Sequence, residues 1–276
     1  MNPSQMQSAA AVLAPGVGAA WLTGIGLLAL RIAATFAMTP VLYALPLPPV
    51  VRSLLTLGLA LAIASGLGAP SVEWTDWSAL LLAAMRELAL GATLGLGILL
   101  AFGAFSVAGQ LLDVQLGFGM AQIVDPVTHR PIPVLTSAFN YLAVLLFFIL
   151  NGHHALLRGI AYSLEKFPLG ASWPMGYAVA PVIKQAAGLF SLGFALVAPV
   201  VFCILLVEFA LGVIGRNLPQ MNMFAMGIPI KIVVGLVALS FWFAGVGAVM
   251  ARVYSGIAVT WDGIFQSVPA PAQGAR

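Results

Sequence analysis

Residues 109–133 read GQLLDVQLGFGMAQIVDPVTHRPIP and separate two strongly apolar runs of the chain. Glycines at 117 and 119, followed by three prolines, argue against one continuous helix through this stretch. Between Asp113 and Asp125, however, the segment is too apolar to be an ordinary solvated loop. Nonhelical apolar backbone at membrane depth is tolerated only where protein or a water-filled cavity surrounds it. The stretch therefore predicts a gate, a selectivity filter or the broken helix of a transporter.

The composition is that of an integral membrane protein. Of 276 residues, 62% are hydrophobic and only 7% are charged, against about 25% charged in a typical soluble domain. The apolar runs are long enough for membrane helices, whereas the strands of a membrane barrel alternate and span about ten residues. The net charge of +3 is spread along the chain, which gives nucleic-acid binding no support. The single cysteine, Cys203, excludes an intrachain disulfide and is expected to pack in an apolar run.

Charged residues punctuate the chain at intervals close to the length of a membrane span. We therefore expect an all-α membrane protein with about six long hydrophobic helices, at residues 19–37, 51–67, 80–112, 134–150, 181–212 and 226–253. Gly91 and Gly95 in the third helix form a small-residue face suited to close helix packing. An amphipathic stretch with Arg158, Glu165 and Lys166 follows the fourth helix. A short polar connection makes the last two helices an antiparallel hairpin, so the chain looks like two unequal parts.

Arg31, Glu208 and Lys231 are among the charged residues inside the predicted membrane helices, and we take them as the charges at membrane depth. A charge at membrane depth costs about 2.5–3.5 kcal/mol on insertion scales, so each is expected to face protein or water. Glu208 and Lys231 lie at similar distances on either side of the hairpin turn, so their side chains could meet across it. Such a pair is either a structural ion pair or a site for proton relay or subunit contact.

Phe118, between two glycines, is the most suggestive single residue of the opening stretch. With Leu116 and Met120 it could form the bulky face of a mobile plug; the alternative is an aromatic ring packed in a bend. Asp113 and Asp125 are expected to mark the two ends of the apolar segment and to cap the helices there. The predicted gating residues are Gly109, Asp113, Leu116, Gly117, Phe118, Gly119, Met120, Asp125 and Pro126.

Catalysis has little support in the sequence. No Ser or Cys lies in the stretch that holds the two aspartates, and no nucleotide-binding, zinc-protease or hydrolase motif is present. One Cys and three His, two of them adjacent, cannot assemble a zinc site. His153 and His154 follow the end of the fourth helix, where a pair at the membrane interface is favoured over a proton relay. We therefore expect a protein that is not an enzyme and that needs no metal or cofactor.

Several stretches closely resemble the FliR family of flagellar export-gate proteins, which are homologous to the SctT proteins of the injectisome. They are AGQLLDVQLGFGMAQIVDP, PVLTSAFNYLAVLLFFILNGHHALLRG with the downstream EKFPLG, and GRNLPQMNMFAMGIPIKIVVG. An early LRIAATFAMTPVLYALPLPPVVR looks like the first hairpin of that family. The resemblance covers nearly the whole chain in order and spacing, and it favours the flagellar branch.

The resemblance implies a FliP-like helical part at residues 19–177 and a FliQ-like hairpin at residues 178–256. An N-terminal segment (1–18) and a C-terminal tail (257–276) would flank them, and the family's plug would correspond to about residues 106–125. The implied partners are FliP-type and FliQ-type subunits in a hetero-oligomer, an FlhB-type subunit, the lipid membrane and unfolded flagellar export substrates. The implied location is the bacterial inner membrane, in the flagellar basal body.

Two other functions remain open at this point. The first is the injectisome counterpart, which would use the same mechanism on effector proteins as cargo. The second is a secondary transporter that uses Asp113, Asp125 and Glu208 for ion coupling in broken helices. A transporter of that kind is expected to contain inverted repeats, and no repeat is visible in the sequence.

Overall fold

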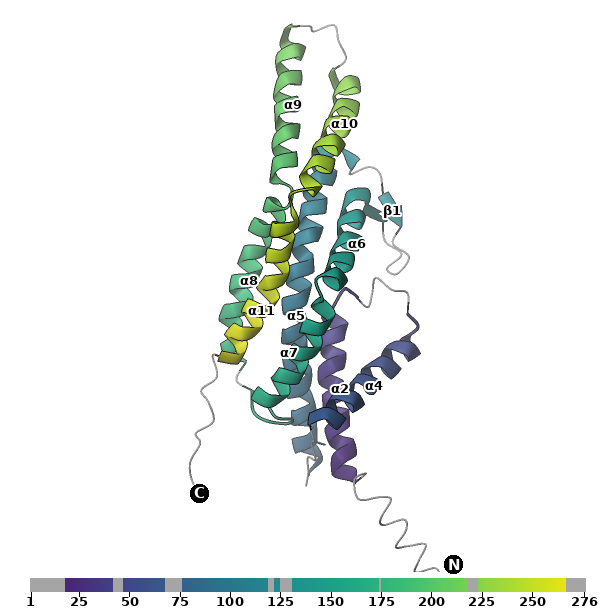
Figure 1. The fold of residues 1–276 in the computed structure, drawn as a ribbon, viewed down its shortest axis with the longest axis vertical. Helices are drawn as coiled ribbons and strands as arrows, with labels where there is room; N and C mark the ends of the chain where they lie inside the picture. Colours follow the sequence, from purple (N-terminus) through teal and green to yellow (C-terminus); the bar gives the residue numbers. More distant parts are fainter. Residues whose placement is uncertain are drawn as a thin grey trace, which may run out of the picture. The chain divides into compact units, whose positions relative to one another are not determined.

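The computed structural model describes residues 18–41, 47–67, 76–118, 122–124, 131–173, 175–217 and 223–266. The helices in these ranges are α2 (Ala19–Met38), α4 (Pro49–Leu67), α5 (Trp77–Leu116), α6 (Val134–Ile149), α7 (Gly152–Lys166), α8 (Gly176–Ala195), α9 (Ala198–Asn217), α10 (Met223–Phe243) and α11 (Gly247–Gln266) (Figure 1). Two short strands, β1 (Gln122–Val124) and β2 (Pro131–Pro133), form the one sheet of the described residues. The predicted fold class, an all-α membrane protein, is confirmed.

Six helices are long and apolar enough to cross a membrane: α2, α4, α5, α8, α9 and α10. The expected number of six is therefore correct for the described residues, but the set of helices differs from the prediction. The predicted fourth span, α6, has only 16 residues and passes the same test only as a bent pair with α7. The amphipathic stretch after it is helical, as α7.

The last two predicted spans are each broken into two helices. The helix expected at residues 181–212 is interrupted at Leu196 and Val197, between α8 and α9. The helix expected at residues 226–253 is interrupted before Gly247, and α11 then continues to Gln266, into the region expected to be tail. Trp242 Nε1 donates a hydrogen bond of 2.8 Å to the Leu196 carbonyl, so the two breaks lie beside each other.

The α9–α10 hairpin is confirmed as antiparallel. Leu211 lies near Gly227 close to the turn, and Ile204 lies near Gly235 further from it. Figure 1 shows the two helices side by side, and they have the most extensive contact of any helix pair in the described residues.

The chain divides into two compact units, and α5 contributes residues to both. Unit 1 comprises residues 1–42, 47–96 and 157–176, and unit 2 comprises residues 43–46, 97–156 and 177–276. This division rests on contacts within the chain. It does not test whether residues 19–177 resemble a FliP-type subunit and residues 178–256 a FliQ-type subunit, which stays a prediction.

In unit 1 the small-residue face of α5 packs directly on α2. A Cβ atom added at Gly91 would lie 2.2 Å from the backbone carbonyl oxygen of Arg31, and one added at Gly95 would lie 2.6 Å from that of Thr35. Thr35 also donates its hydroxyl hydrogen bond to the carbonyls of Arg31 (2.9 Å) and Gly91 (3.1 Å). The close packing predicted for Gly91 and Gly95 is confirmed.

In unit 2 an aromatic cluster joins α5, α6 and α11. The rings of Phe102 and Phe105 on α5 and Phe147 on α6 each lie within about 6 Å of the Tyr254 ring, distances usual for attractive ring pairs. The Tyr254 hydroxyl donates a hydrogen bond to the Ala143 carbonyl, which satisfies its polar end inside this apolar core.

Candidate functional site

The C-terminal part of α5 is held against α6 at three levels within unit 2. Ser106 Oγ lies 2.7 Å from Asn140 Oδ1, within hydrogen-bond distance. Gly109 allows the closest approach, since a Cβ atom there would lie 2.5 Å from the Cα atom of Thr136. Below it, Asp113 reaches the first turn of α6. Gly109 is therefore a packing position in a continuous helix, and the break in the chain comes after it.

Asp113 caps the N-terminus of α6 from a neighbouring helix. Its Oδ1 accepts the backbone N–H of Leu135 at 3.0 Å, and its Oδ2 accepts the backbone N–H and hydroxyl of Thr136 at 2.8 and 2.7 Å. The N-cap residue of α6 is Pro133, which supplies no side-chain hydrogen bond. The first N–H groups of a helix need acceptors and attract negative charge, and the buried Asp113 meets both needs.

Asp113 precedes the apolar segment in sequence, but it does not lie at a helix end as expected. The residue lies inside α5, which continues to Leu116. Its capping role was expected, but the helix it caps is the one that follows the segment. The register between the α5 and α6 helices, which the sequence alone does not supply, brings the carboxylate to that terminus.

Leu116, the last residue of α5, is fully buried. A Cβ atom on Gly235 of α10 would lie 2.2 Å from a Leu116 methyl group, so the leucine side chain fills the space that this glycine leaves. Leu116 is therefore an anchor of the helix end and not part of the expected mobile face. Gly117 then ends the helix with φ of +80°, a left-handed conformation that glycine adopts without strain.

The rest of the predicted plug is only partly described. Phe118 is half-buried, whereas Gly119, Met120, Asp125 and Pro126 lie outside the described residues. Further along, β1 pairs antiparallel with β2, with Gln122 opposite Pro133 and Val124 opposite Pro131. This ribbon, which the sequence did not reveal, brings the end of the apolar segment back to the start of α6.

Glu208 and Lys231 form an ion pair across the α9–α10 hairpin, as the spacing suggested. Their side chains are 37% and 25% exposed. The pair borders an open groove of about 570 Å³ whose lining is otherwise apolar or glycine: Leu211, Gly212, Gly215, Gly227 and Ile228. A charged pair in such a groove, on helices able to cross a membrane, is suited to contact with another polar or protein surface.

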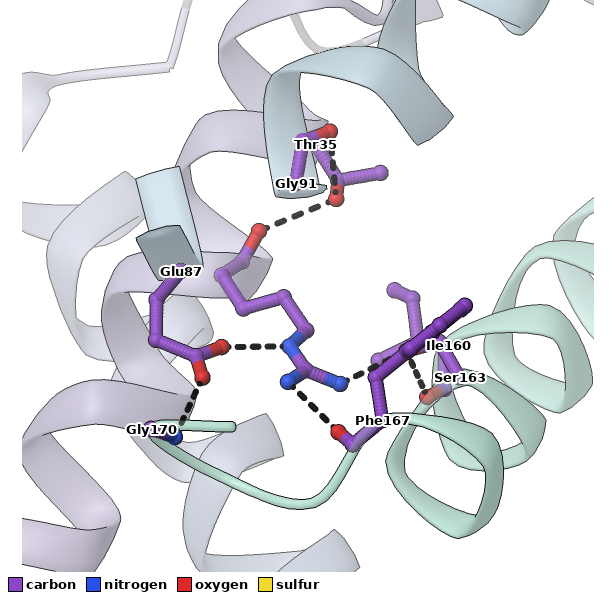
Figure 2. Close-up of polar contacts among 8 residues, drawn as sticks. Thr35, Glu87, Gly91, Ile160, Ser163, Phe167 and Gly170 are labelled. Carbon is purple, nitrogen blue, oxygen red and sulfur yellow. Dashed lines mark hydrogen bonds and ion pairs between the residues drawn. The ribbon is translucent and has the colours of Figure 1, made fainter. Parts of the chain in front are cut away.

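A buried polar network in unit 1 is centred on Arg31; Figure 2 labels its partners Glu87, Ser163 and Phe167. Its Nε donates to Glu87 Oε2 at 2.6 Å, and its two terminal nitrogens donate to Ser163 Oγ at 3.0 Å and to the Phe167 carbonyl at 2.9 Å. The other Glu87 oxygen accepts the backbone N–H of Gly170 at 2.9 Å. The network ties α2, α5, α7 and the turn after α7 together, and Arg31 faces protein as predicted.

Glu87 is the partner of Arg31 that sequence reasoning missed. It stands directly before the uncharged part of α5 and is only 2% exposed. It also precedes Gly91 by four residues, so it lies on the same face of the helix as the glycines that contact α2. An acidic residue one turn before a small-residue face was the available signal.

Among the described residues, the remaining polar side chains include no metal-binding cluster and one pair of neighbouring histidines. Within the described ranges no group of three or more His, Cys, Asp or Glu residues could hold a metal ion. The rings of His153 and His154 lie 4.2 Å apart at the start of α7. No hydrogen-bond partner for His153 Nδ1 is present among the described residues.

Comparison with known proteins gives this geometry a context. A family profile described as "Bacterial export proteins, family 1" matches residues 22–257. The Flagellar biosynthetic protein FliR of Bacillus subtilis (strain 168) is 32% identical, over 82% of this chain and 88% of the relative. Proteins of the same name from Escherichia coli (strain K12) and Caulobacter vibrioides are 31% and 28% identical, over 78% and 89% of this chain and 84% and 92% of the relatives. The chain therefore belongs to family 1 of the bacterial export proteins, the FliR family.

Proposed function

We propose that this chain is a core pore subunit of the flagellar type III protein export gate. In this role it supplies a plug, within about residues 106–125, that closes the channel through which unfolded flagellar proteins are exported. Family membership and the relatives' name, Flagellar biosynthetic protein FliR, support the export function. The mechanism requires no catalysis and no cofactor, since the chain acts by opening and closing.

The observation that carries the plug assignment is the fixed frame around the apolar segment. Asp113 and Gly109 bind the end of α5 to the start of α6, and Leu116 is locked against α10. The left-handed Gly117 then releases the chain from the helix. We assign the closing element to the residues after Gly117, with Phe118 and Met120 as its bulky face, and the frame to the residues before it.

The groove beside Glu208 and Lys231 supports assembly with other subunits. We assign this face of the α9–α10 hairpin to contact with a FliP-type or FliQ-type subunit, because a half-exposed ion pair in an apolar surrounding is better covered by protein than by lipid. An FlhB-type subunit would attach to the same gate in the bacterial inner membrane, within the flagellar basal body.

A secondary transporter is the rival that the broken helices favour, since transporters bind their ions where membrane helices are interrupted. Two of the three carboxylates it would use are already engaged, Asp113 by α6 and Glu208 by Lys231. This weakens ion coupling at these positions and favours the gate. The injectisome counterpart has the same mechanism, and the names of the relatives favour the flagellar cargo.

Removing residues 117–121 tests the plug directly. The variant and the unaltered chain are expressed with their partner subunits, and ion conductance is measured in planar bilayers containing the purified complex. We expect the shortened chain to assemble normally and to raise the leak conductance, because the frame is intact and the closing residues are missing.

The matched control is Val114→Ala, which alters a side chain on the last turn of α5 that is 76% exposed. It should leave the conductance low. A shortened chain that assembles and conducts no more than the control would exclude the plug assignment, while export of flagellar proteins by the complex would still be open to test by motility.

A further inference from the structure

An apolar cavity of about 330 Å³ lies within unit 2, beside the junction of α6 and α7. Its walls come from α5, the end of α6, the start of α7 and α11, and include Ile98, Phe147, Leu156, Tyr254, Ala258 and Trp261. The cavity is roughly twice the size of an engineered cavity of about 150 Å³ that binds benzene. It also falls in the range of about 300–1,000 Å³ typical of ligand pockets.

Two polar side chains of the walls, those of Tyr254 and Ser255, already have hydrogen-bond partners. The Tyr254 hydroxyl donates to the Ala143 carbonyl, and Ser255 Oγ donates to the Arg252 carbonyl at 2.9 Å. A buried water needs two to four polar partners, so these walls are better suited to hydrocarbon than to water. Ala155, Ala251 and Ala258 line the cavity and are exposed, which leaves one side of it open.

The surface next to the cavity changes from apolar to polar within a few residues. Phe148, Ile149 and Leu150, at the end of α6, are all exposed apolar side chains. Asn151 and the stacked histidines follow at once, and His153 Nδ1 is buried with no partner among the described residues. This change from an apolar to a polar surface matches the structure of a phospholipid, whose hydrocarbon chains adjoin a polar head group.

We propose that this cavity binds one acyl chain of a membrane phospholipid. The acyl chain lies between α5, α7 and α11, and the glycerol and head group of the lipid lie beside Asn151 and His153. Six helices of the described residues are long and apolar enough to cross a membrane, so membrane phospholipid is available to the chain as a ligand. The bound lipid fills the space that the bend between α6 and α7 leaves open, independently of the gate function.

Photo-crosslinking tests the site. The full chain is expressed with its partner subunits and reconstituted with a phosphatidylethanolamine that carries a diazirine at the end of one acyl chain. After irradiation, labelled peptides are quantified by mass spectrometry. We expect labels on the cavity walls, including the peptides around Leu156 and Ala258, with the mass of the intact phospholipid.

Ala258→Trp fills the cavity, and we expect it to reduce labelling of the walls at least tenfold. The control is Ala248→Trp, at an exposed alanine of α11 outside the lining, which should keep the label. If Ala258→Trp does not accumulate, Ala155→Leu fills the same space from α7. Unchanged wall labelling in the filled variant, adducts of a free fatty acid only, or labelling spread evenly over all exposed apolar helices would each overturn the proposal.

Discussion

At the scale of single residues, two buried carboxylates hold this chain together in different ways. Glu87 neutralises a buried arginine, whereas Asp113 accepts the free N–H groups of a helix terminus. Both are at most 2% exposed, so water cannot replace the partners that they hold. Removing either carboxylate should therefore lower the stability of the chain in a distinct way.

The Arg31–Glu87 pair should be strongly coupled. Arg31→Met or Glu87→Leu alone leaves an uncompensated buried charge, and we expect each to lower the free energy of unfolding by about 3–5 kcal/mol. The double variant should lose about 2 kcal/mol less than the sum of the two. Unfolding in mild detergent measures all three. Arg158→Met, at an exposed arginine of α7, is the control and should change little; additive single effects would contradict the coupling.

Asp113→Asn should loosen the first turn of α6. The amide keeps one acceptor oxygen but turns an NH₂ group toward donors, so we expect a loss of about 1–3 kcal/mol. Thr136→Val removes only the hydroxyl bond and should cost about 1 kcal/mol. Hydrogen exchange at the Leu135 and Thr136 amides should accelerate in Asp113→Asn and much less in Thr136→Val. Equal protection in Asp113→Asn and the unaltered chain would mean that another group caps α6.

The two ion pairs differ in how far the sequence predicts them. Glu208 and Lys231 are joined by one short hairpin, so counting residues from the turn brings them together. Arg31 and Glu87 are 56 residues apart, and their pairing depends on how α2 and α5 are aligned. The same alignment decides which helix Asp113 caps. Long-range register comes from packing, and a single sequence carries it only weakly.

At the scale of elements, apolar content predicts where helices lie but not where they break. The α8–α9 and α10–α11 breaks fall inside runs that stay apolar throughout, so charge spacing cannot reveal them. Pro199 just after one break, and Gly245 and Gly247 at the other, were the local signals. The β1–β2 ribbon was not predicted because strands of three residues are too short to show an alternation of apolar and polar side chains.

The packing of α2 on α5 should depend on Gly91. A Cβ atom there would meet a backbone oxygen, which cannot rotate away, so we expect Gly91→Ala to cost at least 1–3 kcal/mol, an order of magnitude typical of overpacking. Gly58 in α4 has no atom within 4 Å of an added Cβ. Gly58→Ala should therefore stabilise the chain by about 0.5–1 kcal/mol through helix propensity. Thermal unfolding of the two variants gives shifts of opposite sign if close packing is the cause, and similar shifts if it is not.

At the scale of the whole molecule, large apolar side chains remain exposed on the helices able to span a membrane, and lipid or other subunits can cover them. On α9 and α10, Phe209 and Phe241 are 73% and 79% exposed. Apolar exposure alone does not distinguish the two coverings, because both are apolar. Charge does, since lipid chains do not bind an ion pair whereas a protein surface can.

Exchanging the charges of the hairpin pair separates a role within the chain from a role between subunits. In the double variant Glu208→Lys with Lys231→Glu, the ion pair across the hairpin can still form, so the chain should fold and enter the membrane as before. A neighbouring subunit whose own charges pair with Glu208 and Lys231 would now face like charges at both positions. Like charges brought together oppose binding. We expect co-purification with the FliP-type and FliQ-type subunits to fall about tenfold, equivalent to about 1.4 kcal/mol.

The single variant Lys231→Glu controls for loss of the pair and should be defective in both folding and assembly. If the exchanged chain instead assembles as well as the unaltered one, the pair stabilises the hairpin alone and the groove is covered by something indifferent to charge.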